Sequence, residues 1–165
     1  MRGFSLIELV VSLLLASVLV GVFLDRALYY RELAEKSAME QVAMDIRSSV
    51  NLRVAELVLN NRFAELSDLA NQNPMDLLAR KPANYLGVLA TSSWSTASPG
   101  NWYFDSTSKE VVYLIDLGRY FVPDGRVQQR VAWHITLVRG GAGKPELPQW
   151  ARFELVKPYV WFNRA

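Results

Sequence analysis

The sequence predicts an α+β protein in which one long N-terminal helix is followed by a small antiparallel sheet. Residues 4–24 form an apolar run of about 21 residues that contains a single charge, Glu8, and a membrane-spanning helix needs about 20. Later in the chain, short segments alternate apolar and polar residues, which is typical of strands. The 165 residues leave room for one modest domain beyond the helix.

The helical pattern continues beyond the apolar run. Apolar residues recur there at three- and four-residue steps: Met39, Val42, Ile46, Val50, Val54 and Leu57. Glu32 and Lys36 stand at the spacing of a favourable ion pair on a helix. No proline interrupts this stretch, and the pair Asn60-Asn61 is a suitable end. A helix over residues 4–60 would be about 85 Å long.

A connecting region and a sheet are expected after this helix. Two short helices are expected, one over residues 62–70 and one beginning at Asn73-Pro74, where asparagine suits the N-cap and proline the first helical position. Residues 82–87 are expected to turn the chain, and residues 91–100 to form a loop.

Strand signals then follow in quick succession. Residues 102–104 and 111–115 are expected to pair as a hairpin across residues 105–109. Residues 131–138 and 151–155 show the two-residue period of strands. Together these segments predict an antiparallel sheet of about three or four strands, packed on the apolar stripe of the helix.

The N-terminus combines several features at fixed spacing. Arg2 and Gly3 precede Phe4, Glu8 follows four residues later, and the apolar run begins at once. A carboxylate in a membrane segment is costly and is normally kept for a partner or a function. An ordinary secretory signal is excluded, because its cleavage site would follow the apolar stretch.

This N-terminus resembles the processing site of type IV prepilins and type II secretion pseudopilins. The resemblance implies the pilin ladle: residues 1–3 as a leader, residues 4–25 as a transmembrane and filament-core helix, and residues 26–165 as a periplasmic head. The head is expected to comprise a helix over 26–60, a connecting region over 61–100, a sheet over 101–157 and a tail over 158–165. Asp25 stands about where many pilins carry a helix-breaking proline, which favours an unbroken helix here.

The resemblance also implies roles for individual residues. A prepilin peptidase would cleave between Gly3 and Phe4 and then methylate the new amine of Phe4. The Glu8 carboxylate would pair with the Phe4 amine of a neighbouring subunit, which compensates two costly charges in a low-dielectric site. Glu8 has two alternative roles. It could pair with the Phe4 amine of its own chain, or it could reach the headgroups without a partner.

The expected function is that of a structural, non-enzymatic subunit of a type IV pilus or a type II secretion pseudopilus. The chain contains no cysteine and therefore lacks the disulfide that clamps many major pilins, which favours a minor subunit. The expected partners are the prepilin peptidase, other pilin or pseudopilin subunits, the inner-membrane assembly platform and the lipid bilayer. The expected location is the bacterial inner membrane, with one span, a cytoplasmic N-terminus and a periplasmic head, and then the filament.

No cofactor and no catalytic set are expected, and the single histidine, His134, is expected to point outward from a strand. Asp116 and Asp124 could bind calcium, but two carboxylates are too few to predict a metal site. A net charge of +2 and scattered arginines argue against a nucleic-acid partner. Two alternatives stay open: a filament-displayed adhesin or DNA-binding minor pilin, and a simple signal-anchored periplasmic domain. The aromatic tail over residues 159–162 is expected to cover the sheet edge or to contact a neighbouring subunit.

Overall fold

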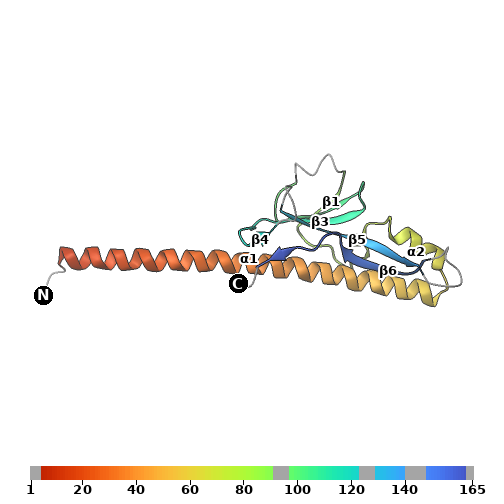
Figure 1. Ribbon diagram of the computed structural model, residues 1–165, viewed down its shortest axis with the longest axis horizontal. Helices are drawn as coiled ribbons and strands as arrows, with labels where there is room; N and C mark the ends of the chain where they lie inside the picture. The colour runs from red at the N-terminus through yellow and green to blue at the C-terminus, as the bar shows by residue number, and fades with distance from the viewer. Residues whose placement is uncertain (1–4, 91–96, 123–128, 140–147, 163–165) are drawn as a thin grey trace.

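The computed structural model describes residues 5–90, 97–122, 129–139 and 148–162. Helix α1 (Leu6–Leu59) runs the length of the molecule, and a mixed sheet lies over its second half (Figure 1). With 54 residues, α1 is about 81 Å long. Its first half projects away from the sheet (Figure 1). The expected α+β arrangement and the single unbroken helix are confirmed.

Helix α1 ends where the Asn60-Asn61 pair predicts. The N–H of Arg62 donates to the carbonyl of Leu57 at 2.8 Å, and the N–H of Asn61 donates to the carbonyl of Val58 at 3.1 Å. This is the Schellman pattern, which satisfies two of the last carbonyls of the helix. Asn61 has a φ of 55°, and asparagine tolerates this left-handed conformation because its short side chain can hydrogen-bond locally.

Two short helices follow, as expected. The first is α2 (Phe63–Leu69). The second, η1 (Pro74–Leu77), is a 3-10 helix, and the Asn73 side chain caps it by accepting a hydrogen bond from the N–H of Met75 at 3.1 Å. Leu66 and Met75 are fully buried, so both helices help to close the core beside α1.

The main sheet has five strands in the order β1-β2-β3-β5-β6. They are β1 (Tyr85–Leu89), β2 (Trp102–Asp105), β3 (Glu110–Leu114), β5 (Arg130–Arg139) and β6 (Pro148–Leu155). The pairs β2–β3, β3–β5 and β5–β6 are antiparallel. The predicted hairpin and the two later strands are therefore confirmed.

The prediction of a purely antiparallel sheet of three or four strands is wrong. Strand β1 adds a fifth strand and pairs with β2 in parallel, inside the region expected to be only connecting. The expected turn is found at residues 83–84, where the N–H of Tyr85 donates to the carbonyl of Pro82 at 3.1 Å, and β1 begins directly after it. Gly87 has a φ of 96° where the register shifts between Tyr85 and Val88. This glycine therefore marks a bulge in an edge strand.

A two-stranded sheet forms the part of the head nearest the free half of α1. Strand β4 (Phe121–Val122) pairs antiparallel with β7 (Val160–Trp161), and Trp161 is buried. The tail, as far as residue 162, therefore folds against its own chain, and the five-stranded sheet itself ends at Leu155. Residues 159–162 thus pack within the head, and contact of the tail with a neighbouring subunit stays a prediction.

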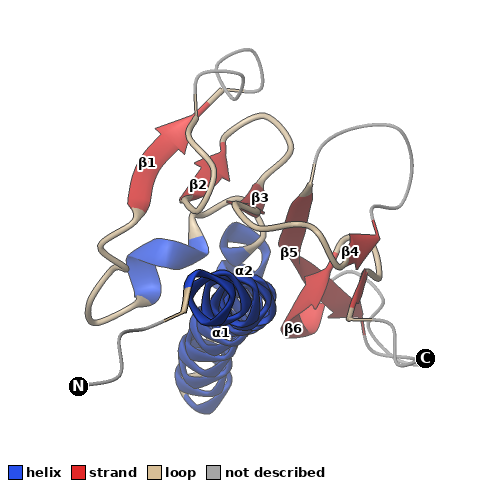
Figure 2. Ribbon diagram, turned by 90° about the vertical axis from the view of Figure 1, so that its left-hand side faces the viewer, coloured by secondary structure: helices blue, strands red, loops and turns tan. Residues whose placement is uncertain are grey.

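The core lies between α1 and the sheet, which curves around one side of the helix (Figure 2). The predicted apolar stripe is buried except at Val42, which is half-buried, while its neighbour Ala43 is buried. Opposite the stripe, the rings of Trp133 lie 5.3 Å from Trp102 and 6.3 Å from Phe153 between centroids. Each fully buried large apolar side chain contributes about 1.5–3 kcal/mol.

Candidate functional site

The first half of α1 exposes an extended apolar surface. Every residue from 5 to 24 is exposed, and Leu6, Leu19 and Phe23 are 79 %, 70 % and 70 % exposed. An apolar surface of this extent marks a contact with lipid or protein. Residues 6–24 rise about 28 Å, close to the thickness of a bilayer's hydrocarbon core. Helix α1 is thus long and apolar enough to cross a membrane once.

Glu8 is the single ionisable residue among residues 5–24, and it lies in the first turn of α1. Its backbone carbonyl accepts a hydrogen bond from the Ser12 hydroxyl at 2.8 Å. Its carboxylate is exposed and makes no hydrogen bond or ion pair with the described residues. Gly3 and Phe4 lie outside the described residues, so cleavage between them and pairing with Phe4 stay predictions.

The head begins where the apolar surface ends. Arg119 Nη1 lies 2.9 Å from Asp25 Oδ1, immediately after residue 24. One turn later, the Tyr29 ring packs edge-on against Tyr120 and Phe162, with centroids 5.5 and 5.2 Å apart. No linker therefore separates the apolar half of α1 from the head.

Glu35 holds the segment that follows β3. Its Oε1 accepts hydrogen bonds from the Tyr113 hydroxyl at 3.0 Å and from the N–H of Asp116 at 2.7 Å. Its Oε2 accepts from the N–H of Leu117 at 2.8 Å. One carboxylate on α1 thus satisfies two backbone donors and one hydroxyl of a segment that has left the sheet, which ties that segment to the helix.

Glu32 ties the two-stranded sheet to α1 in the same way, a role that its spacing along the sequence does not predict. The side chain is only 2 % exposed, and its Oε1 accepts hydrogen bonds from the Tyr120 N–H and from the Trp161 indole N–H, both at 2.8 Å. The expected pair with Lys36 is not the one formed, because Lys36 Nζ instead lies 3.7 Å from Glu40. One sequence feature could have indicated this burial. Glu32 lies seven residues before Met39, and this spacing places it on the same face of the helix as the buried stripe.

Two tyrosines that donate to α1 carboxylates predict a loss of stability in alkali. Burial, reinforced by the negative charge of Glu35, raises the pKa of Tyr113 above its ordinary value of about 10. Burial and Glu40 raise the pKa of Tyr159 in the same way, and its hydroxyl donates to Glu40 at 3.0 Å. Above about pH 10 the unfolded chain therefore binds fewer protons than the folded one, so the free energy of unfolding falls as pH rises.

The measurement is the thermal unfolding midpoint of the full chain in detergent, from neutral pH to about pH 11. The midpoint should be insensitive to these groups below about pH 10 and should fall above it. The double variant Tyr113→Phe/Tyr159→Phe should show a shallower alkaline slope. Tyr30→Phe, at an exposed tyrosine on α1, is the control and should keep the wild-type slope. Equal slopes in both variants would contradict the assignment.

The structure describes two of the three remaining predicted polar residues, Asp116 and His134. Asp116 is exposed and adjoins Glu35 through its backbone, while Asp124 lies outside the described residues. His134 is half-buried on the sheet face opposite Trp133, and its Nε2 lies 2.9 Å from the Thr136 hydroxyl. Within the described ranges, no group of three or more histidine, cysteine, aspartate or glutamate side chains could hold a metal ion.

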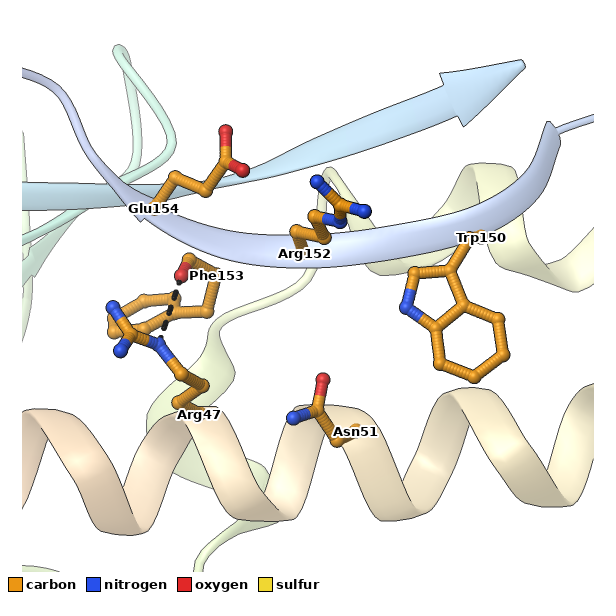
Figure 3. A pocket seen from close by; sticks show the side chains of 6 residues that line it. All are labelled: Arg47, Asn51, Trp150, Arg152, Phe153 and Glu154. Carbon is orange, nitrogen blue, oxygen red and sulfur yellow. Dashed lines mark hydrogen bonds between the residues drawn. The ribbon is translucent and has the colours of Figure 1, made fainter. Parts of the chain in front are cut away.

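A groove of about 560 Å³ runs between α1 and the outer edge of β6 (Figure 3). Its lining residues are Arg47, Asn51, Trp150, Arg152, Phe153 and Glu154. Arg47 Nε donates to the Phe153 carbonyl at 3.3 Å, which covers an outward-facing acceptor on the last strand of the sheet. None of the six lining side chains is a hydroxyl, thiol or imidazole.

Comparisons of the chain with known protein families, with curated proteins and with solved structures find no match. Function is therefore inferred from the residues and their geometry.

Proposed function

We propose that this chain is a structural subunit of a filament of the type IV pilin and type II secretion pseudopilin class, and that it assembles from a membrane. The observation that carries the proposal is α1 itself. One continuous helix joins an exposed apolar half, with Glu8 in its first turn, directly to a folded head. The Arg2-Gly3-Phe4 junction before it supplies the processing site that the resemblance implies.

The apolar half of α1 suits both a bilayer and a filament core. Lipid tails and apolar side chains of neighbouring copies cover such a surface about equally well, so transfer between them needs no change of conformation. The bilayer and the filament core differ in whether the Glu8 charge finds a partner. In a bundle of staggered helices, Glu8 of one copy can meet the Phe4 amine of the next, which compensates both charges away from water.

Within such a filament, we propose a low-copy role for this chain, in a pilus or in a pseudopilus. The absence of cysteine from the whole sequence removes the disulfide lock of many major pilins. The tail is held instead by hydrogen bonds from Tyr159 and Trp161 to glutamates of α1. A minor subunit needs the helix for packing and a stable head, and this chain has both.

N-terminal mass spectrometry tests the proposal. The protein is isolated from membranes and from sheared filaments of cells with and without the prepilin peptidase. We expect a chain that begins at methylated Phe4 only when the peptidase is present, with a small share in the sheared fraction. A chain that keeps Met1, Arg2 and Gly3 in every fraction would overturn the proposal and favour a simple membrane-anchored domain.

A further inference from the structure

We infer that the base of the head binds the headgroup layer of the membrane through an arginine collar, formed by Arg26, Arg31 and Arg119. The partner is a phospholipid surface, with a preference for anionic headgroups. This inference rests only on insertion of α1 into a bilayer, a step that the proposed filament subunit shares with a simple anchored domain.

The height of the collar fits the headgroup layer. Residues 25–31 rise about 9 Å beyond the apolar run, and the headgroup layer on each side of a bilayer is about 5–8 Å thick. Side chains on a helix lean toward its N-terminus, so those of Arg26 and Arg31 lean toward the membrane. Arg119 reaches the same level, because its guanidinium lies 2.9 Å from Asp25.

The arginines surround the helix. At about 100° per residue, Arg26 and Arg31 point about 140° apart. Asp25, which holds Arg119, lies about 100° from the first and 120° from the second. Three cationic groups thus face three directions around one axis. A single protein partner would meet one side of the helix, whereas headgroups around a spanning helix meet every side, so this arrangement favours lipid.

The side chains of the collar are available to phosphate. Arg26 and Arg31 are exposed, and neither is a member of an ion pair among the described residues. The Arg119 side chain is 61 % exposed and also lies over the Tyr120 ring, 5.6 Å from its centroid. Guanidinium groups bind phosphate oxygens with two parallel hydrogen bonds. Arg119 has a second effect, since it neutralises the Asp25 carboxylate that would otherwise repel an anionic surface.

Aromatic rings at the same level complete the surface. Tyr29 packs edge-on against Tyr30, with centroids 5.6 Å apart, and also against Tyr120 and Phe162. Tyr30 is 63 % exposed. Tyrosine is enriched at the boundary between hydrocarbon and water, because its ring is apolar and its hydroxyl is polar. Arginines and tyrosines at the same level are the residue types expected where a protein contacts lipid headgroups.

The test measures lipid selectivity of the full, uncleaved chain in bilayers. Electron paramagnetic resonance of spin-labelled phosphatidylglycerol and phosphatidylcholine gives their relative association with the protein. We expect the wild type to prefer phosphatidylglycerol, by up to about fivefold for each of Arg26 and Arg31 at low salt, and less at high salt. Arg26→Gln/Arg31→Gln should lose most of this preference. Arg119→Gln should also lower it, because it exposes the Asp25 charge.

The matched control is Arg62→Gln/Arg152→Gln, which removes the same charge from exposed arginines of the head, one beyond the far end of α1 and one on β6. It should keep the wild-type preference, and thermal unfolding should show that both double variants fold. A wild type without selectivity, or a collar variant that keeps it, would overturn the inference. Because no peptidase is present, neither result bears on cleavage at Gly3 or on filament assembly.

Discussion

Glu8→Gln is expected to remove the chain from sheared filaments, by at least about tenfold, while leaving cleavage after Gly3 intact. The substitution keeps the shape of the side chain and deletes its charge. A neutral amide makes insertion into the membrane easier, since an ionised carboxylate inside a bilayer costs up to about 2.5–3.5 kcal/mol. Loss from the filament would therefore report an unpaired Phe4 amine in the packed helices and not a failure of insertion.

The measurement is quantitative mass spectrometry of the membrane and sheared fractions, with the N-terminal peptide reporting cleavage in each. Glu56→Gln provides the matched control, because it makes the same change at an exposed glutamate of the head that forms only a surface pair with Arg53. This control should enter filaments normally. If Glu8→Gln enters them at the wild-type level, the paired-charge role of Glu8 is wrong, and a glutamate that reaches the headgroups is the better description.

Glu32→Ala is expected to lower the free energy of unfolding by about 3–5 kcal/mol. The variant leaves two donors without an acceptor, the Tyr120 N–H and the buried Trp161 indole N–H. Each hydrogen bond to a charged group contributes about 1.5–3 kcal/mol, and domains are stable by only about 5–15 kcal/mol. Release of β7 and the base of the head should therefore precede global unfolding.

Urea unfolding of the full chain in detergent measures this loss, and the indole resonance of Trp161 reports the local change. Glu32→Gln retains a carbonyl acceptor and should lose less stability than the alanine variant. Glu56→Ala serves as the control for a surface carboxylate and should cost less than about 1 kcal/mol. A Glu32→Ala variant as stable as this control would contradict the anchoring role.

Features set by neighbouring residues could be predicted from the sequence. The period of the apolar stripe, the Asn60-Asn61 end of α1 and the Asn73 cap depend on contacts within a few residues, and all three are found. The hairpin of β2 and β3 is found for the same reason. The candidate processing and assembly residues are also readable, because Gly3, Phe4 and Glu8 form a short linear pattern.

Pairings between remote segments could not be predicted in this way. Strand β1 joins β2 in parallel after an intervening loop, and its alternation is weak because Leu86 and Val88 are exposed apolar residues on an edge strand. The donors to Glu32 lie 88 and 129 residues further along the chain. The four-residue spacing on a helix indicates only Lys36 as a partner for Glu32, and that prediction is wrong.

The sequence by itself determined one long helix, apolar and membrane-compatible at its start and amphipathic further on, because helical periodicity is a local property. Only the tertiary structure decided how the head is attached to that helix. The burial of Glu32 and the three hydrogen bonds to Glu35 depend on where the chain returns after β3 and β6. A buried carboxylate is stable only when donors meet it, and the fold, not the spacing along the chain, supplies those donors.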